Sequence, residues 1–362
     1  MGAVDVGRAP LIGMVAPPWV PVPPPAYGGI EQVVDLLCET MASRGWDVTL
    51  IAAPGSGPSG TRTIAPLPEV PAQIGLGDVE LAHVLAGLRE LDGHDVIIDH
   101  SGPLGALLAS LSGAPVLHVV HGPLDAEARE LYGLICARAP GLRLIAISHA
   151  QIRMAPELPF AGVAYNGLAL DDVPFRSHSD GYLAFLGRMA PEKGVADAIE
   201  IARRAGRRLL IAAKCREPDE HEHFARVVEP ALGPDVEWLG EIGPHDKYRL
   251  LGGAAALVFP IAWAEPFGMV MIEAMACGTP VLATPCGSVP EVVDDGITGV
   301  VSDDLGALAD AAADPGRFDR EACRAHVARH FSAAGMAQAY ERLIDAALAA
   351  PGEGRVRGVQ AG

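Results

Sequence analysis

The sequence predicts two doubly wound α/β domains, in each of which helices cover a parallel sheet. The chain has 362 residues, more than one hydrophobic core usually fills. Short apolar runs alternate with helical patterns through both halves, which is the rhythm of parallel βα units. A polar joint near Asp171–Gly181 separates the two sets of units, so two domains fit better than one eight-stranded barrel.

Each expected strand is a short apolar run that leads into a turn marked by glycine or proline. The first domain is expected to form the strands Leu11–Ala16, Val48–Ala53, Asp95–His100, Pro115–His121, Leu144–Ser148 and Val163–Asn166. The second is expected to form Tyr182–Gly187, Leu209–Ala213, Val236–Gly240, Ala256–Pro260, Pro280–Thr284 and Thr298–Val301. Helices are expected between them, among them Ile30–Ser43, Val195–Ala205, Lys247–Gly252 and Met269–Ala276.

Three segments fall outside this rhythm. Pro54–Asp78 is rich in Gly, Pro, Ser and Thr, which predicts a mobile loop of the first domain. Ser332–Ala349 is expected to be a helix with Ser332 as its N-cap. The tail Pro351–Gly362 is expected to be disordered. The predicted domains are therefore residues 1–175 and 176–331, followed by a terminal helix over 332–350 and the tail over 351–362.

The composition is that of a soluble globular protein, with half of the residues hydrophobic and a fifth charged. A formal net charge of −18 argues against a nucleic-acid partner and against stable association with an anionic membrane. The six cysteines contain no C-x-x-C pair, which predicts reduced thiols. Since no secretory leader is evident, we expect a cytoplasmic protein.

Two glutamates, Glu265 and Glu273, lie in the otherwise apolar stretch Ala264–Thr279. Burying an unpaired carboxylate is costly. Either each glutamate has a buried partner in the protein, or both face a cleft and accept hydrogen bonds from a ligand. The amides of Gly268, Met269 and Val270 begin the expected helix between them, where an anion would bind.

The turn after the strand Tyr182–Gly187 carries two cations, Arg188 and Lys193. An arginine fork and a lysine point charge suit a diphosphate. The alternative is a solvated loop in which Glu192 pairs with Arg188 or with Lys193.

Three other polar features of the sequence were candidates for a site. Gly28 and Gly29 precede a helix and permit close approach of an anion, but they do not form the G-x-G-x-x-G pattern of nicotinamide cofactor sites. His121 ends a strand, where it can reach a ligand, whereas His118 is expected to be a core residue. The cluster Asp219–His223 is interpreted as a solvated helix start, so no metal site is predicted.

Over nearly its whole length the chain resembles the family 4 glycosyltransferases of the GT-B fold. The resemblance rests on motifs that occur in the family's order. They are Gly-Gly-Ile-Glu at 28–31, His121-Gly, Tyr165-Asn-Gly, Gly-Arg-Met-Ala-Pro-Glu-Lys-Gly at 187–194, and the two glutamates separated by seven residues, Glu265 and Glu273. The GT-B fold has two Rossmann-like domains that face each other across a cleft, and its last helix crosses back to the first domain.

The resemblance implies roles for individual residues. Arg188 and Lys193 would bind the diphosphate of a nucleotide-sugar donor, Glu273 the ribose, and Glu265 the transferred sugar. His121 would contact the sugar near the reacting carbon. Further donor-binding residues implied in this way are Gly28, Gly29, Gly187, Leu239 beside the nucleobase, Phe267, Gly268, Met269 and Val270. Acceptor-binding residues are expected to include Tyr27, His100 and Asn166. Lys214 replaces a glycine that many members have, which leaves the nucleobase preference open.

The resemblance also implies a retaining enzyme that needs no metal or other cofactor. Retention by double displacement would require a carboxylate within reach of the anomeric carbon, and none is evident. A donor phosphate oxygen would instead take the proton of the acceptor hydroxyl on the same face of the sugar. The acceptor is expected to be a soluble small molecule or saccharide. Two alternatives are a non-hydrolysing nucleotide-sugar epimerase of the same fold and a non-catalytic nucleotide-sugar binder.

Overall fold

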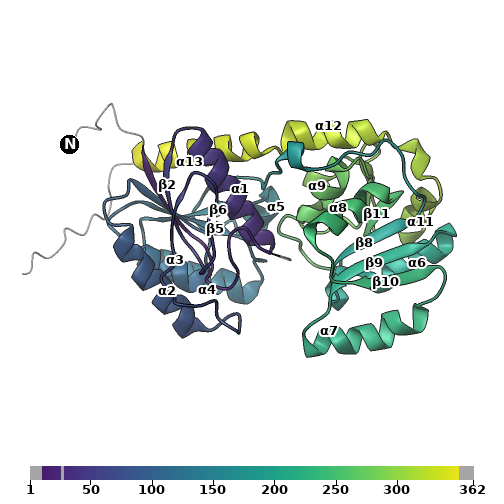
Figure 1. The fold of residues 1–362 in the computed structure, drawn as a ribbon, viewed down its shortest axis with the longest axis horizontal. Helices are drawn as coiled ribbons and strands as arrows, with labels where there is room; N and C mark the ends of the chain where they lie inside the picture. Colours follow the sequence, from purple (N-terminus) through teal and green to yellow (C-terminus); the bar gives the residue numbers. More distant parts are fainter. Residues whose placement is uncertain (1–9, 26–27, 350–362) are drawn as a thin grey trace, which may run out of the picture. The chain divides into compact units, whose positions relative to one another are not determined.

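The structure is a computed structural model that describes residues 10–25 and 28–349. It divides into two compact units, each with its own parallel sheet (Figure 1). One unit contains the described residues up to Gly167 together with those from Met336 onward, and the other contains Leu168–Gly335. The predicted fold class, two Rossmann-like α/β domains, is confirmed.

The first unit is built on a seven-stranded sheet in the order β3-β2-β1-β4-β5-β6-β7, in which all neighbouring strands are parallel. Its strands are β1 (Leu11–Val15), β2 (Asp47–Ile51), β3 (Arg62–Ile64), β4 (Val96–Asp99), β5 (Val116–Val120), β6 (Leu142–Ala146) and β7 (Phe160–Val163). The helices are α1 (Gly29–Ser43), α2 (Gly77–Glu90), α3 (Pro103–Ala109), α4 (Ala126–Arg138), α5 (His149–Met154) and most of α13 (Ala333–Ala349). Helices α2, α3 and α4 lie together on one face of the sheet (Figure 1).

The second unit has a six-stranded parallel sheet in the order β10-β9-β8-β11-β12-β13. Its strands are β8 (Leu183–Arg188), β9 (Leu209–Lys214), β10 (Val236–Gly240), β11 (Ala256–Phe259), β12 (Val281–Ala283) and β13 (Gly299–Val301). The α-helices are α6 (Val195–Ala205), α7 (Pro218–His223), α8 (Pro244–Gly253), α9 (Met269–Ala276), α10 (Val289–Val292), α11 (Leu305–Ala313) and α12 (Arg320–His330). Short helical turns are η1 (Leu170–Asp172), η2 (Pro191–Lys193), η3 (Phe224–Val228), η4 (Glu229–Ala231) and η5 (Pro315–Arg317). Helix α6 packs with α11, and α9 packs with α8 and α12 (Figure 1).

The twelve expected strands all occur, but two expectations in the first unit need correction. The segment Pro54–Asp78 contains β3, which pairs with β2 through Thr49 and Arg62, so it is not a loop throughout. This strand has only three residues, and the glycines and prolines around it hide its pattern. Strand β7 occupies Phe160–Val163 rather than Val163–Asn166, because Phe160 pairs with Leu144 at the start of the ladder.

The division between the units lies at Gly167, earlier in the chain than the expected boundary at residue 175. Leu168 donates its amide to Phe331 O (2.9 Å) and accepts from Ala333 N (2.9 Å), which holds the following residues on the second unit. Helix α13 begins at Ala333, and the Ser332 hydroxyl accepts the Gly335 amide as the expected N-cap (3.2 Å). The tail 351–362 lies outside the described residues.

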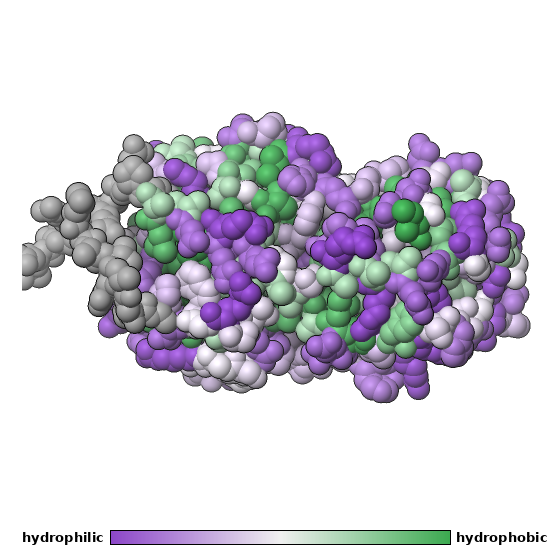
Figure 2. Space-filling model, turned by 90° about the horizontal axis from the view of Figure 1, so that it is seen from above, coloured by the Kyte–Doolittle hydropathy of each residue, from purple (hydrophilic) through white to green (hydrophobic). Residues whose placement is uncertain are grey.

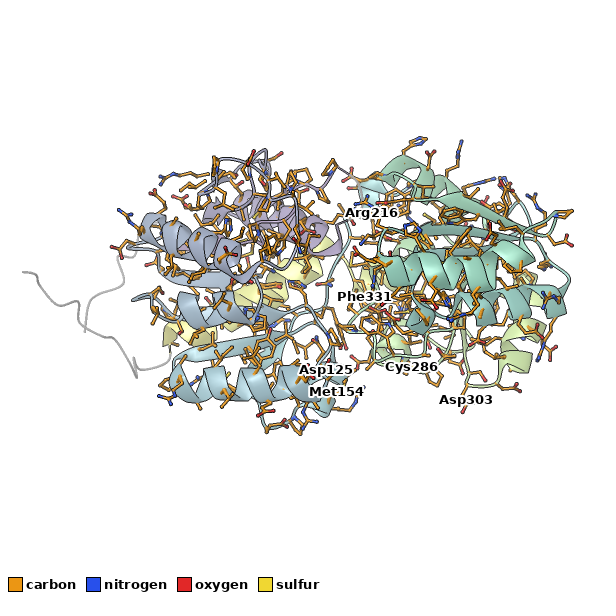
Figure 3. The ribbon with its side chains drawn as sticks, turned by 90° about the horizontal axis from the view of Figure 1, so that it is seen from below. Asp125, Met154, Arg216, Cys286, Asp303 and Phe331 are labelled. Carbon is orange, nitrogen blue, oxygen red and sulfur yellow. The ribbon has the colours of Figure 1, made fainter. Side chains whose placement is uncertain are left out.

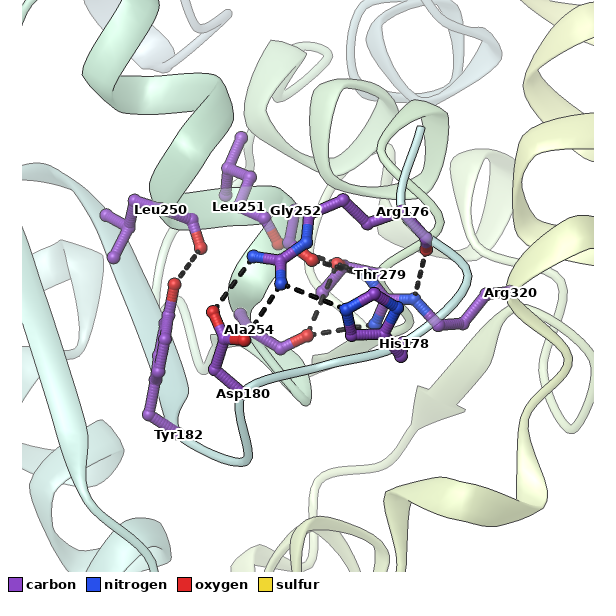
Figure 4. Close-up of polar contacts among 10 residues, drawn as sticks. All are labelled: Arg176, His178, Asp180, Tyr182, Leu250, Leu251, Gly252, Ala254, Thr279 and Arg320. Carbon is purple, nitrogen blue, oxygen red and sulfur yellow. Dashed lines mark hydrogen bonds and ion pairs between the residues drawn. The ribbon is translucent and has the colours of Figure 1, made fainter. Parts of the chain in front are cut away.

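The segment that leads into β8 is anchored by one arginine (Figure 4). The Arg320 guanidinium donates to the carbonyls of Arg176 (2.7 Å), Gly252 (2.7 Å) and Ala254 (2.9 Å), and also to the Thr279 hydroxyl (2.8 Å). Burial lowers the pKa of Arg320 below its usual range. These neutral acceptors therefore satisfy a buried cation without a carboxylate contact, and they fix the start of the second sheet.

Hydrophilic and hydrophobic residues are interspersed over the surface seen in Figure 2. Within residues 10–25 and 28–349, no helix combines the length and the apolar character needed to cross a membrane. All six cysteines are free thiols, and Cys38, Cys277 and Cys323 are buried.

Candidate active site

The predicted donor residues of the second unit lie along the carboxyl edge of its sheet. β8 ends at Arg188 and β9 at Lys214, and the two residues are register partners. The loop after β11 leads through Glu265 to Gly268, whose positive φ of 76° places it in the left-handed region at the start of α9. The first amides of α9 have no carbonyl partner inside the helix. This edge is where doubly wound sheets bind ligands.

Glu265 and Lys193 form a nearly buried ion pair. Lys193 Nζ lies 2.7 Å from Glu265 Oε2, and the two side chains are 13% and 10% exposed. The Trp263 indole donates to the same oxygen (3.0 Å), and the ammonium lies 4.2 Å from the centre of its ring. One carboxylate oxygen thus holds a lysine and a tryptophan together, at the point where an anion would meet the amides of α9.

A neighbouring loop fixes the backbone of Glu265. Ser288 donates its amide to Glu265 O (3.0 Å) and its hydroxyl to Phe267 O (2.8 Å). Gly287 has a φ of +59°, and a Cβ there would overlap the backbone of Glu265. Both residues follow Cys286, on the loop after β12 (Figure 3). Gly287 and Ser288 were not among the predicted site residues, although a Gly-Ser pair in the loop after a strand is a signal that could have marked them.

Glu273 also has a lysine partner. Lys247 Nζ on α8 lies 2.5 Å from Glu273 Oε1 on α9, with both side chains nearly buried. Of the two interpretations of the glutamates, a buried partner is therefore correct for each. A buried partner does not exclude a role in ligand binding, since both carboxylates lie at or beside the sheet edge that forms the candidate site. Lys247 was not among the predicted site residues, because nothing in its local sequence marks it.

Arg188 pairs with Glu192 in its own loop, which is one of the two pairings expected for a solvated loop. Its guanidinium donates to Glu192 Oε1 (3.0 Å) and lies 3.7 Å from Glu220 Oε1. Lys214 Nζ lies 3.8 Å from Glu217 Oε1. Lys193 does not pair with its sequence neighbour Glu192 but with Glu265, in the loop after β11. Gly187 is half-buried on β8, Leu239 is exposed on β10, and Phe267 is buried before Gly268, Met269 and Val270.

The cluster Asp219–His223 belongs to the short helix α7, as expected, but it is not solvated throughout, because Glu220 and His223 are buried. Glu220 accepts the amides of Arg216 (2.8 Å) and Glu217 (3.2 Å) in a capping box, so it is engaged by the backbone. In the part of the chain that the structure describes, no group of three or more His, Cys, Asp and Glu side chains is arranged to hold a metal ion.

In the first unit, two predicted residues lie together at the carboxyl edge of the sheet. His100 follows β4, His121 follows β5, and His100 Nδ1 is 2.9 Å from His121 Nε2. Their rings stack with centres 5.2 Å apart. His118 is buried as expected, between Asp99 (2.6 Å) and Tyr132 (2.9 Å).

The other site residues predicted in this unit are Gly28, Gly29, Asn166 and Tyr27. A Cβ at Gly28 would lie 2.6 Å from Pro24 Cβ, whereas Gly29 has open space around it. Asn166 is buried, and its Oδ1 has no hydrogen-bond partner among the described residues. Tyr27 lies outside the described residues. Only Gly28 of the two glycines is therefore required locally by packing.

The stability of the first unit should depend on pH through its histidine pair. Burial lowers the pKa of His121 to about 3, and the nearby His118 acts in the same direction. Burial also lowers the pKa of His100 well below its usual range. Because an unfolded histidine binds its proton near pH 6.5, the unfolded state takes up protons as the pH falls from about 6.5 toward 3. The stabilisation is complete above pH 6.5 and falls with pH by up to about 1.4 kcal/mol per unit for each histidine.

Urea unfolding at pH 7 and pH 5 measures this dependence. His121→Asn should lose less stability between the two pH values than the wild-type protein does. His245→Asn, at an exposed histidine, should behave as wild type. Equal pH dependence in all three proteins would contradict the assignment of a buried neutral pair.

Comparison with known proteins decides the family. A family model described as Glycosyltransferase Family 4 matches residues 27–171, and one described as Glycosyl transferases group 1 matches residues 180–314. The chain belongs to the family 4 glycosyltransferases. The resemblance predicted from the paired glutamates and the glycine-rich turns is confirmed.

Curated relatives match over shorter segments. The alpha-maltose-1-phosphate synthase of Mycolicibacterium smegmatis is 36% identical over 126 residues, which are 33% of this chain and 32% of that protein. The D-inositol 3-phosphate glycosyltransferase of Kribbella flavida is 35% identical over 159 residues, 37% of this chain and 36% of that protein. The match thus spans about a third of the length of these relatives.

Several solved structures match nearly the whole chain. AviGT4, a glycosyltransferase involved in avilamycin A biosynthesis, is 25% identical with a TM-score of 0.68, covering 94% of this chain and 98% of that one. Sucrose-phosphate synthase from Thermosynechococcus elongatus is 22% identical with a TM-score of 0.77, covering 93% and 100%. HepE from Anabaena, solved with UDP-glucose, is 18% identical with a TM-score of 0.70, covering 93% and 99%. The last two show the shared fold.

Proposed function

We propose that this glycosyltransferase moves a sugar from a nucleoside-diphosphate sugar to a hydroxyl group of a small-molecule or saccharide acceptor. The observation that carries the proposal is the contact of Lys193 with Glu265 and Trp263, just before the first amides of α9. A diphosphate needs cations and amide donors, and a sugar needs hydroxyl acceptors and an apolar face. This edge of the sheet offers all of them.

Donor binding would exchange the partners in this cluster. The Lys193 ammonium, now held by Glu265, would turn to the more highly charged diphosphate. Glu265 Oε2 would then accept a sugar hydroxyl while keeping the Trp263 indole as its second donor. Arg188, which is about a third exposed, would exchange Glu192 for phosphate oxygens in the same way. The carboxylates that now pair with Lys193 and Arg188 would thus be replaced by phosphate oxygens of the donor.

The transfer would proceed with retention of configuration. The acceptor oxygen attacks the anomeric carbon on the face from which the phosphate leaves, and the bonding electrons pass to the departing phosphate. That phosphate takes the acceptor proton. Lys193 and the α9 amides would stabilise the charge on the leaving group. His121, whose lowered pKa keeps its imidazole neutral at pH 7, would serve as a hydrogen-bond partner of the sugar.

The similarity to known proteins supports this reaction class. One relative is a D-inositol 3-phosphate glycosyltransferase, and one structure of similar fold, HepE, was solved with UDP-glucose. The sugar, the nucleobase and the acceptor of the present chain are not carried over from them. Lys214, at the end of β9, is a candidate contact of the base or of a phosphate.

A panel of UDP-, ADP- and GDP-sugars tests the proposal. We expect one class to raise the melting temperature and to release its nucleoside diphosphate in the presence of an acceptor from a panel of polyols and saccharides. Incubation with the donor alone separates the alternatives. A new sugar nucleotide formed without acceptor would indicate an epimerase, and binding without turnover of any acceptor would indicate a non-catalytic binder.

Activity is expected to survive removal of divalent metal. In the proposal, the two cations and the α9 amides take the charge of the leaving diphosphate, a task that a metal ion performs in other enzymes. The turnover rate in the presence of EDTA should therefore be the same before and after Mg²⁺ is added in excess of the EDTA. A complete loss that Mg²⁺ or Mn²⁺ restores would contradict the metal-independent mechanism.

A further inference from the structure

The contact of Lys247 with Glu273 has features that packing alone does not require. Nζ lies 2.5 Å from Oε1, and the side chains are 13% and 5% exposed. The ammonium also lies 5.0 Å from the centre of the Tyr248 ring. The pair joins α8 to α9, two helices that pack against each other. A charge pair this far from water is costly to form, and an apolar pair of similar size would often be as stable.

The two oxygens of Glu273 are in different situations. Oε1 is held by Lys247, whereas the described residues place no hydrogen-bond donor on Oε2. Glu273 lies one turn after Met269, the first residue of α9. The titratable groups that interact with Glu273 are Lys247 on α8, the Tyr248 hydroxyl and the Cys277 thiol, and burial raises the pKa of the hydroxyl and of the thiol. Of these three groups, Lys247 is the one that brings a positive charge to Glu273.

We propose that Lys247 is a positioning residue for the donor nucleotide, which holds Glu273 Oε1 so that Oε2 accepts the vicinal hydroxyls of the ribose. The inference rests on the proposed function, in which Glu273 binds the ribose. Lys247 acts through the glutamate, since its contact with Oε1 fixes the rotation of the carboxylate about the last side-chain bond. A carboxylate so fixed accepts charge-assisted hydrogen bonds from a diol without further ordering.

The experiment measures how strongly the protein prefers a nucleoside diphosphate with both ribose hydroxyls to one that lacks the 2′ and 3′ hydroxyls. Calorimetry gives the Kd of the preferred nucleoside diphosphate, chosen from UDP, ADP and GDP, and the Kd of its 2′,3′-dideoxy form. Wild type should bind the ribonucleotide at least about tenfold more tightly. Lys247→Met should reduce this ratio to within about threefold of unity, as Glu273→Gln should, whereas Lys247→Arg should retain most of it.

Two controls separate positioning from general destabilisation. Arg249→Ala removes an exposed cation from the same helix and should leave the ratio as in wild type. Thermal melts are recorded for every variant, and Lys247→Gln replaces Lys247→Met if the methionine variant does not fold. An unchanged ratio in the neutral variant overturns the inference, even if its melting temperature falls.

The outcomes distinguish this inference from the proposed function. If wild type binds none of the three nucleoside diphosphates, the proposed function fails and the inference fails with it. If wild type binds one of them without discrimination, the roles of Glu273 and Lys247 fail while glycosyl transfer stands. If discrimination persists without the lysine charge, only the positioning role of Lys247 fails.

Discussion

Replacing Lys193 with alanine is expected to lower kcat/KM about 10²–10³-fold, equivalent to about 2.7–4 kcal/mol of transition-state stabilisation. The side chain supplies the cation that would face the leaving diphosphate, and Glu265 holds it beside α9. The same change leaves the nearly buried Glu265 with the Trp263 indole as its remaining partner, so the melting temperature should fall as well. Donor release assays at several donor concentrations measure the first effect, and thermal melts the second.

Two further variants isolate the role of the charge. Lys193→Arg keeps the cation and should retain more activity than Lys193→Ala. Arg204→Ala removes an exposed cation that pairs with Glu200 on α6, and it should leave kcat/KM within about threefold of wild type, since exposed pairs contribute little. If Lys193→Ala matched Arg204→Ala in kcat/KM, Lys193 would not bind the diphosphate.

Gly194→Ala is expected to destabilise the second unit strongly and to lower activity at least about tenfold. Gly194 has a φ of +77°, and a Cβ there would overlap the carbonyl oxygen of Pro260 at the end of β11. The adjacent Lys193 loop is also tied to this region by the Ala262 amide, which donates to Glu192 O (2.9 Å). The substitution would push the loop away from β11 and would separate Lys193 from Glu265.

Gly206→Ala is a matched control for this variant. Gly206 ends α6, the helix that Gly194 begins, and it has a comparable φ of +64° with nothing within contact distance of a Cβ. Its alanine variant should lose about 1–2 kcal/mol from backbone strain alone and stay active. Gly194→Ala should lose at least about 2 kcal/mol more, from the steric overlap. Urea unfolding measures the free energy of unfolding of both variants. Equal losses would contradict the prediction, because the overlap with Pro260 would then not destabilise the protein.

The amino-acid sequence determined the fold class and the positions of the chemistry along the chain. Apolar runs predicted twelve of the strands because a strand buried on both faces needs continuous hydrophobic residues. Helix α9 was predicted from Met269 to Ala276, as observed, because Gly268 marks its start. The motifs around Arg188, Lys193 and Glu265 could be placed at strand ends, since the carboxyl edge of a parallel sheet follows from the strand order. Strand β3 escaped because it is a partly exposed edge strand whose three residues, Arg62–Ile64, include a single apolar one.

Only the tertiary structure decided which partner each charged side chain takes. Glu265 pairs with Lys193, 72 residues away, and Glu273 with Lys247, 26 residues away, although Glu192 is the sequence neighbour of Lys193. The contact of His100 with His121 likewise depends on the parallel pairing of β4 with β5. A sequence shows that a buried carboxylate needs a partner, because desolvation is costly wherever the residue lies. It does not show which cation is near, since that distance is set by how α8 packs on α9 and how β8 lies beside β11.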